Sequence, residues 1–282
     1  MKNYKTYFFA LSIAAFGMTS CKNDAQKDSK STTQNWTFET KIALDSFGII
    51  GIAKAEDGNL WLSDADNNRL IKFDLKTKKV SETLNDFDRP MHISTRDGAL
   101  FVAEYGADQI TKIQNGKREK LAFSDAFDAS SGVDTEGGKT AVADFYNHRI
   151  VFTEGDKSLI IGKKGGGIGE LTYPTDVQFA NGKLYVADAY NHRVQVFDPS
   201  GKPLKTFGEA EKMNAATGIY VTDKDVFVTD FENSRILVYD TEGVLKQILT
   251  DNLDKPTDVL VIDNQLFIVN YHGRFISVFK QN

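Results

Sequence analysis

The chain has 282 residues, of which 41% are hydrophobic and 26% are charged, a balance typical of a globular domain with ample material for a core. Its formal net charge of −5 argues against nucleic acid as a partner, because phosphate binding depends on an excess of Lys and Arg. A single cysteine excludes intramolecular disulfides and thiolate metal clusters, so the fold has to close by packing and hydrogen bonding.

The N-terminus has the pattern of an export signal. Two lysines precede an apolar run from Tyr7 to Met18, which is too short for a stable transmembrane helix. The run ends just before Cys21, and this arrangement resembles the lipobox of bacterial lipoproteins, with an ordinary secretory signal as the alternative. We therefore predict a signal peptide over residues 1–20 and lipidation of Cys21 in the bacterial cell envelope. Among the bacterial lipoproteins that this arrangement resembles, Lys22 rather than Asp after the cysteine implies the outer membrane.

The segment after the cysteine is predicted to be a tether. From Lys22 to Asn35 no apolar residue is larger than Ala25. Such a segment cannot bury enough surface to offset the entropy lost on ordering, so we expect a flexible tether over residues 21–35. Residues 36–282 are predicted to form one domain.

A polar motif recurs along this domain. It consists of an acidic or amide residue, here called the anchor, then Asn three residues on, Arg five on and an apolar residue six on. The clear copies begin at Asp64, Asp144, Asp188 and Asp230, and weaker ones begin at Glu104 and Asn270. The anchors are 40, 40, 44, 42 and 40 residues apart. This period, with strand patterning, is typical of propeller blades and predicts an all-β, six-bladed β-propeller.

Each repeat is expected to supply four strands. In the fourth repeat these are residues 176–179, 184–188, 194–198 and 204–207, counted from the innermost first strand to the outer fourth strand. The sixth repeat ends after its third strand, whereas Trp36–Leu44 alternates like a strand and precedes the first repeat. We predict that Trp36–Leu44 completes the last blade and closes the ring.

The turns divide between the two ends of the ring. Turns between first and second strands are tight, with pairs such as Asp97-Gly98 and Asn181-Gly182, and the antiparallel strands place them at one end, the short-turn end. The connections that follow the second and fourth strands meet at the opposite, long-loop end. We expect ligands at the long-loop end, because a tight hairpin offers little adaptable surface.

The runs Asp144–Ile150 and Asp188–Val194, with Tyr173 to Val177 upstream, resemble the NHL repeat. This resemblance implies a six-bladed β-propeller and leaves the activity open. Similar propellers include scaffolds, extracellular sensors, RNA-binding modules and a metal-dependent amidating lyase, and related six-bladed rings include calcium-dependent lactonases. The expected export and the acidic charge disfavour RNA binding.

The anchors are expected to be structural. One alternative makes them an acidic ring, but a binding site rarely needs the same residue in every blade. We expect each anchor to accept backbone N–H bonds in its own turn between the second and third strands, with the arginines pairing to carboxylates within or between blades. These arginines are Arg69, Arg149, Arg193 and Arg235, and His148 and His192 lie in the same motif.

The residues that open the first strands suggest a site in the central channel. They are Gly51, His92, Gly132, Asp176, Gly218 and Asp258, so the three polar ones occupy alternate repeats. One histidine and two carboxylates converging on the channel mouth could bind a divalent cation. The lyase places several histidines around its channel, so a single one disfavours a zinc lyase, and a simple turn into the strand is the alternative.

Aromatic residues follow most anchors at the long-loop end. Phe145 and Phe231 are expected to pack between blades, while ligand contact and loop packing stay open for four tyrosines. These four are Tyr105, Tyr146, Tyr190 and Tyr271.

No Ser-His-Asp or Cys-His arrangement is legible in the sequence. We therefore predict a monomeric, lipid-anchored propeller without a cofactor, acting as a non-catalytic binding or scaffold module for an envelope protein, peptide or glycan. The alternative is a metal-dependent hydrolase, lactonase-like, or a lyase. Its site would be His92, Asp176 and Asp258 at the channel mouth, with a bound divalent cation.

Overall fold

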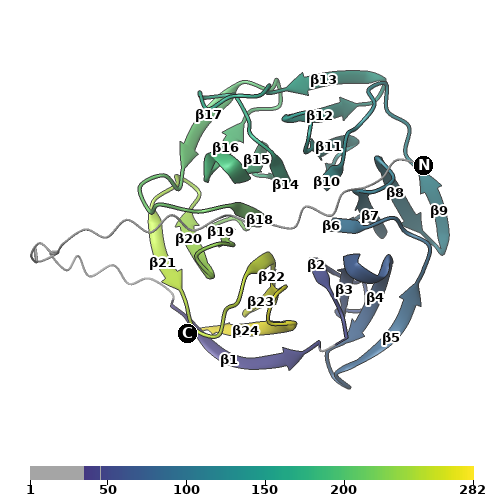
Figure 1. Cartoon of the computed structure of the whole chain (residues 1–282), viewed down its shortest axis with the longest axis vertical. Helices are drawn as coiled ribbons and strands as arrows, with labels where there is room; N and C mark the ends of the chain where they lie inside the picture. The colour runs from purple at the N-terminus through teal and green to yellow at the C-terminus, as the bar shows by residue number, and fades with distance from the viewer. Residues whose placement is uncertain (1–34, 45) are drawn as a thin grey trace, which may run out of the picture. The chain divides into compact units, whose positions relative to one another are not determined.

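The structure, a computed structural model, describes residues 35–44 and 46–282, and in them six four-stranded antiparallel sheets form a ring (Figure 1). The described residues contain no α-helix, and two 3-10 turns, η1 (Ala65–Asn67) and η2 (Ala189–Asn191), follow two of the second strands. Accordingly, no helix in this part of the chain has the length and apolar character needed to cross a membrane. The predictions for residues 1–20, Cys21 and nearly all of the tether lie outside the described residues.

Each of the first five blades pairs four consecutive strands. The strands of blades 1 to 5 are β2 (Ile49–Lys54), β3 (Leu60–Asp64), β4 (Arg69–Asp74) and β5 (Lys79–Leu84); β6 (Pro90–Arg96), β7 (Ala99–Glu104), β8 (Gln109–Gln114) and β9 (Lys117–Lys120); β10 (Ser130–Glu136), β11 (Lys139–Asp144), β12 (Arg149–Glu154) and β13 (Lys157–Ile161); β14 (Pro174–Ala180), β15 (Lys183–Asp188), β16 (Arg193–Phe197) and β17 (Pro203–Phe207); β18 (Ala216–Val221), β19 (Asp225–Asp230), β20 (Arg235–Asp240) and β21 (Leu245–Leu249). Blade 6 consists of β22 (Pro256–Ile262), β23 (Gln265–Asn270), β24 (Phe275–Gln281) and β1 (Trp36–Ala43).

The strand β1 closes the ring as predicted. It pairs antiparallel with β24, from Trp36 opposite Gln281 to Ala43 opposite Phe275. Trp36 is 4% exposed, and its ring meets Phe227 of blade 5 edge-on at 5.5 Å. The backbone N–H and C=O of Trp36 also exchange hydrogen bonds of 2.9 and 2.8 Å with the side chain of Gln247. The strand thus completes blade 6 and attaches it to blade 5.

The blades stack because their second strands are apolar on both faces. Strands β7 and β19 are buried along their whole length. One continuous core cluster, for example, joins Tyr185 and Val194 of blade 4 to Ile219 and Val228 of blade 5. Removing both faces of each sheet from water supplies most of the favourable energy of the ring.

The anchors are structural and pair with the arginines as predicted, but the backbone N–H that each accepts comes from the connection before the first strand and not from the turn after the second strand. In every blade the anchor side chain accepts an N–H from the residue 16 positions earlier, over 2.7–2.9 Å. Asp188, which is fully buried, accepts three more hydrogen bonds, from Asn191 at 2.8 Å and from Arg193 and Gln195 at 2.9 Å. Each anchor therefore ties the start of its blade to the end of the second strand.

We expect Asp188→Ala to lower the free energy of unfolding by about 3–5 kcal/mol, because Arg193, 6% exposed, would lose its carboxylate inside the fold. Urea denaturation of the purified domain measures this loss. Asp223→Ala, in an exposed turn, is the matched control and should change stability by less than about 0.5 kcal/mol. Equal effects of the two substitutions would contradict the structural role of the anchor.

Candidate functional sites: a channel triad and a tyrosine cluster

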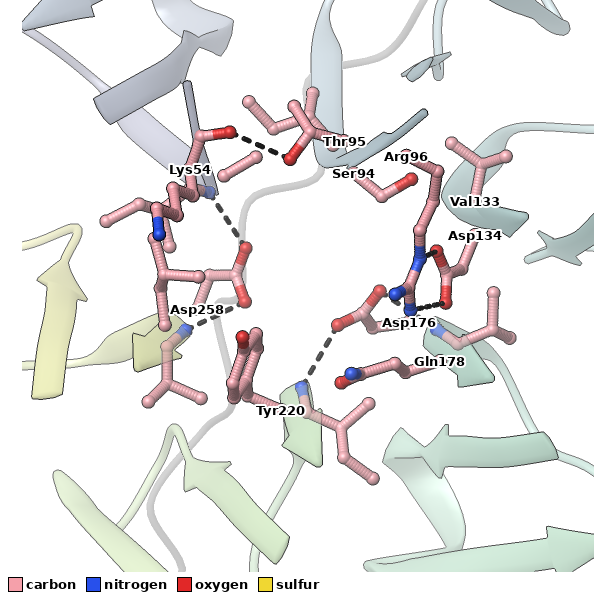
Figure 2. Close-up of a pocket in the computed structure, with 17 residues that line it drawn as sticks. Lys54, Ser94, Thr95, Arg96, Val133, Asp134, Asp176, Gln178, Tyr220 and Asp258 are labelled. Atoms are coloured by element: carbon pink, nitrogen blue, oxygen red, sulfur yellow. Dashed lines mark hydrogen bonds and ion pairs between the residues drawn. The ribbon is translucent and has the colours of Figure 1, made fainter. Parts of the chain in front are cut away.

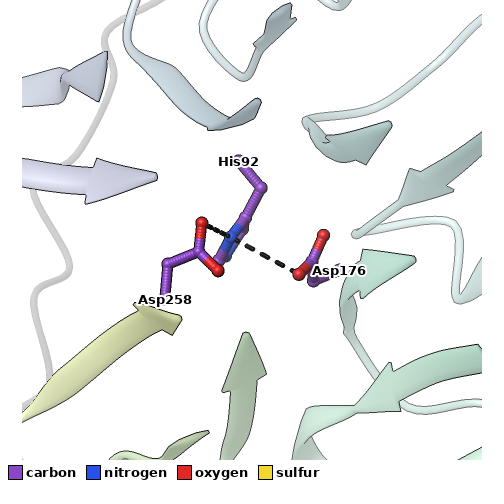
Figure 3. A group of neighbouring side chains, drawn as sticks. All are labelled: His92, Asp176 and Asp258. Atoms are coloured by element: carbon purple, nitrogen blue, oxygen red, sulfur yellow. Dashed lines mark ion pairs between the residues drawn. The ribbon is translucent and has the colours of Figure 1, made fainter. Parts of the chain in front are cut away.

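The structure brings together the three polar residues that open the first strands of blades 2, 4 and 6. His92 Nδ1 lies 3.3 Å from Asp258 Oδ2 and 3.7 Å from Asp176 Oδ2 (Figure 3). One ligand atom of each residue lies within 4.8 Å of the others, and the residues are 3%, 7% and 4% exposed for His92, Asp176 and Asp258. We call this group the channel triad.

The two carboxylates of the triad also join neighbouring blades. Asp258 Oδ2 accepts the N–H of Ile52 in blade 1 over 2.9 Å, and Asp176 Oδ2 accepts that of Ile219 in blade 5 over 3.0 Å. The second oxygen of each carboxylate accepts the N–H of its own next residue over 2.8 Å. The triad therefore has a structural role in addition to any ligand it binds.

Glycine in the alternate blades makes this arrangement possible. A Cβ on Gly132 would lie 2.8 Å from the Cα of Asp176, and one on Gly218 would lie 2.8 Å from the Cα of Asp258. A Cβ on Gly51 would lie 2.9 Å from the Cα of His92. At these positions the first strands of neighbouring blades approach too closely for two side chains, and this explains the alternation of glycine with polar residues.

Burial and mutual attraction set the protonation of the triad. Burial alone would lower the pKa of His92, but the charges of Asp176 and Asp258 outweigh it and raise that pKa to about 9. Burial, together with the nearby charge of Asp258, raises the pKa of Asp176 to about 7 against the attraction of His92. At neutral pH the imidazole of His92 is therefore protonated, and Asp176 is near the midpoint of its titration.

The same atoms fit a divalent cation. Among the described residues His92 Nδ1 has no hydrogen-bond partner, although it is buried beside two carboxylates. Donor atoms 3.3 and 3.7 Å apart can surround one ion at ligand distances of about 2.0–2.3 Å. A nitrogen and two carboxylate oxygens are ligands that several divalent ions accept.

A cavity of about 210 Å³ adjoins the triad along the axis of the ring (Figure 2). First strands of all six blades line it, with Asp176 and Asp258 near the strand starts and Lys54 and Arg96 at the strand ends. Because the first strands end at the tight turns, the cavity extends from the triad toward the short-turn end. The cavity therefore lies away from the long-loop end, where the turn lengths led us to expect ligands.

Arg96 and Asp134 are polar cavity residues that sequence reasoning missed. Arg96 Nε and Nη2 donate to the two oxygens of Asp134 over 3.2 and 3.1 Å, and Nη2 also donates to the carbonyl of Phe179 over 3.3 Å. A signal was present, because His92 and Arg96 are four residues apart and the alternation of a strand puts both on the channel side.

Tyrosines of blades 2, 3 and 4 form a second candidate site at the long-loop end. Tyr105 lies 6.0 Å from Tyr146, which lies 6.0 Å from Tyr173, which in turn lies 4.9 Å from Tyr190, measured between ring centroids. Phe145 packs against the first three of these rings at 4.9–5.9 Å. Tyr146 and Tyr190 are 49% and 41% exposed. We call these five residues the tyrosine cluster.

The other predicted aromatic residues lie outside this cluster. The hydroxyl of Tyr271 donates to Asp66 over 3.1 Å, and burial with the adjacent carboxylate raises the pKa of Tyr271 to about 12. Phe231 lies 5.4 Å from the ammonium group of Lys255. Tyr173 was not among the predicted site residues, although it is the ring that links Tyr146 to Tyr190.

The fold and one repeat can be compared with known proteins. The model of the NHL repeat matches residues 171–197, which contain the whole of β14, β15 and β16. The protein is a β-propeller that contains an NHL repeat. No curated protein matches the chain.

Solved structures agree on the propeller fold. A streptogramin B lyase aligns with a TM-score of 0.67 at 14% identity, covering 88% of this chain and 98% of that one. A gluconolactonase from Xanthomonas campestris aligns with a TM-score of 0.71 at 13% identity, covering 86% and 89%. A chain of a nidogen–laminin complex aligns with a TM-score of 0.61 at 18% identity, covering 71% and 79%. At these identities the likenesses show the fold of this chain and nothing of its activity.

Proposed function

We propose that this propeller is a non-catalytic binding module that holds an envelope protein, peptide or glycan on its tyrosine cluster. The observation that supports this most is the continuity of five aromatic rings over three blades with two tyrosines nearly half exposed. Tyrosine combines a large apolar ring with a polar tip, and such rings concentrate binding energy at recognition surfaces. In this proposal the lipid on Cys21 holds the module at the membrane.

The rigidity of the tyrosine cluster favours recognition. Phe145 contacts three rings of the cluster, and the imidazole of His148 lies 4.3 Å from the ring of Tyr173. His148 Nδ1 accepts the N–H of Tyr173 over 3.1 Å, which fixes the backbone beneath that ring. A partner would therefore meet rings that are already ordered, so little conformational entropy is lost on binding.

A double substitution tests the proposal. We expect Tyr146→Ala with Tyr190→Ala to weaken capture of envelope partners by the tethered protein at least tenfold, at about 1–2 kcal/mol per ring. Quantitative co-purification from envelope extracts, followed by titration of the captured partner, measures the loss. Leu204→Ala removes another exposed apolar side chain, 45% exposed on β17, and should leave capture unchanged. Undiminished capture by the double variant would overturn the proposal.

The channel triad favours a second candidate, a metal-dependent hydrolase, lactonase-like, or a lyase. His92, Asp176 and Asp258 would hold the ion, and the adjoining cavity would admit the substrate. A bound divalent ion would polarise a carbonyl or lower the pKa of a water molecule. The streptogramin B lyase and the gluconolactonase among the similar structures support this candidate.

Metal analysis separates the two functions. If the propeller is a hydrolase or a lyase, protein purified without chelator should contain one divalent ion per chain, and His92→Ala should lose it together with any lactone hydrolysis or streptogramin cleavage. If it is a binding module, chelator treatment should leave partner capture unchanged. Stoichiometric metal with activity that disappears in His92→Ala would favour the enzyme over the binding module.

A further inference from the structure

The outermost strand of each blade has one edge without a neighbouring strand. The six outer strands are β1, β5, β9, β13, β17 and β21 (Figure 1). A free edge presents unpaired N–H and C=O groups that can pair with another chain, and most proteins protect it with bulges, prolines or charges. Five of the six outer strands have such a protective feature, and β13 is the exception.

Bulges and charges protect the five edges. The register of the outer strand shifts in β5, β17, β21 and β1, the outer strands of blades 1, 4, 5 and 6. Strand β17 also begins with Pro203. Strand β9 pairs regularly, but it consists of four exposed, charged residues, Lys117, Arg118, Glu119 and Lys120. A bulge twists the edge out of line and a charged side chain is costly to cover, so these edges resist pairing.

Strand β13 has none of these features. It pairs with β12 in one unbroken register, contains no proline and has Lys157 as its one charged residue. Its first four residues are exposed, and among them Leu159 and Ile160 are 37% and 38% exposed, one on each face of the sheet. Within the described part of the chain, no hydrogen bond reaches the outer backbone edge of β13. The edge is therefore regular, apolar and open.

We propose that β13 is a docking edge for an extended peptide segment, which adds to blade 3 as a fifth strand. The backbone of the peptide would pair with the outer N–H and C=O groups of β13. Two adjacent apolar side chains of the peptide would lie beside Leu159 and Ile160. This inference rests on the proposed function in one respect, because it makes the partner of the propeller a protein or peptide and not a glycan.

A peptide suits this edge better than a second copy of the ring. The outer strands lie on the convex circumference (Figure 1), so two rings joined through β13 would touch over little more than one strand of five residues. One short strand provides too little contact for the roughly 1,000 Å² that a stable interface buries. An extended peptide can instead continue past Ile161, where β13 ends at the long-loop end of the ring, on the side of the tyrosine cluster.

A defined probe peptide tests the docking edge. Acetyl-Glu-Thr-Val-Val-Thr-Glu-amide has the same sequence in both directions, so it offers the same side chains in either strand orientation. We expect it to bind the purified protein saturably in calorimetry and to slow amide hydrogen exchange in β13 but not in β5. The same peptide with both valines N-methylated lacks the central N–H donors and should bind at least tenfold more weakly.

Three results would overturn the proposal. The first is no saturable binding of the probe peptide up to several millimolar. The second is equal affinity for the N-methylated peptide, because binding would then not use backbone pairing. The third is slowed exchange elsewhere in the protein with none in β13. Capture by the tyrosine cluster that persists without peptide binding would leave the proposed function standing and remove this edge alone.

Substitutions that copy a protected edge give a second test. Leu159→Lys with Ile160→Lys gives β13 charged side chains like those of β9, and should weaken binding of the probe peptide at least tenfold. Both side chains are more than one-third exposed, so the melting temperature should change little. Val80→Lys, at a 37% exposed position on β5, is the control and should leave the affinity unchanged.

Two outcomes of this second test would also contradict the docking edge. One is unchanged affinity in the double variant, because the covered edge would then lie elsewhere. The other is a wild-type dimer in analytical ultracentrifugation that the double variant abolishes, which would assign β13 to a second copy of the chain. Since exchange protection is measured on the wild-type protein, a double variant that fails to fold leaves the first test decisive.

Discussion

Deletion of residues 36–44 is expected to lower the free energy of unfolding by on the order of 5–10 kcal/mol, which approaches the whole stability of a typical domain. Trp36, Ile42 and Leu44 are 4%, 7% and 1% exposed, and truncation of such side chains to Ala costs about 2–5 kcal/mol each. The deletion would also expose the edge of β24 and remove the attachment of Trp36 to blade 5. Thermal and urea denaturation of the shortened domain measure the loss.

Point substitutions make the same test without changing the length of the chain. Trp36→Ala should cost about 3–5 kcal/mol, because the indole fills the space between blades 5 and 6. Glu39→Ala, on the exposed face of the same strand, should cost less than about 0.5 kcal/mol. A shortened domain that melts at the temperature of the full domain would show that β1 does not close the ring.

The architecture could be predicted because its information is local and repeated. Each anchor, such as Asp188, bonds to groups within its own blade, so the motif is visible in one stretch of sequence. The closure by β1 was predictable for a related reason. A sixth repeat with three strands and a spare strand before the first repeat have one economical solution in a closed ring.

The channel triad could be predicted only in part. His92, Asp176 and Asp258 alternate with glycines at equivalent positions of the six repeats. This alternation predicted that the three side chains converge, because equivalent positions of a ring meet at its axis. The pairing of Arg96 with Asp134 joins residues 38 apart in different blades and outside the motif. The direction in which the cavity extends depends on which side chains fill the central channel. The period of the repeat gives no information on that filling.

The tyrosine cluster was the least predictable feature. Its rings come from connections of different length in three blades, and their contacts depend on how those loops fold over one another. Tyr173 precedes a first strand while Tyr146 follows a second strand, so the two occupy unrelated positions in the repeat. Counting residues from the anchors therefore found three of the tyrosines and missed the one that connects them.

The pH dependence of stability should reveal the charge of the channel triad. The pKa of His92 is about 9 in the folded protein against 6.5 in the unfolded chain, so its contribution is complete below pH 6.5 and is lost as pH rises through 9. The pKa of Asp176 is raised from 3.8 in the unfolded chain to about 7 in the folded protein. The stability contributed by its protonated carboxyl group is therefore also lost as pH rises from about 4 to 7. With chelator present, the wild-type domain should therefore be less stable at pH 9.5 than at pH 6.

His92→Leu should cost about 3–5 kcal/mol at pH 6, because the buried Asp258 then loses the imidazolium that lies 3.3 Å from its carboxyl group. At pH 9.5 the cost should be much smaller, since the wild-type imidazole is then neutral as well. Denaturant unfolding at the two pH values gives both differences. His272→Leu, whose side chain is 76% exposed beside Asp254, is the control and should have a small effect at either pH.

Divalent metal should reverse this pH trend if the triad is a metal site. Metal binding requires a deprotonated imidazole, so the stabilisation that a bound metal ion provides grows as pH rises. The imidazolium of His92, in contrast, stabilises the fold most at low pH. Wild-type protein that gains stability from added divalent ion at pH 8, with no gain in His92→Leu, would favour the metal site. An equal cost of His92→Leu at pH 6 and pH 9.5 in chelator would instead contradict the charged imidazole, because a packing defect alone does not titrate.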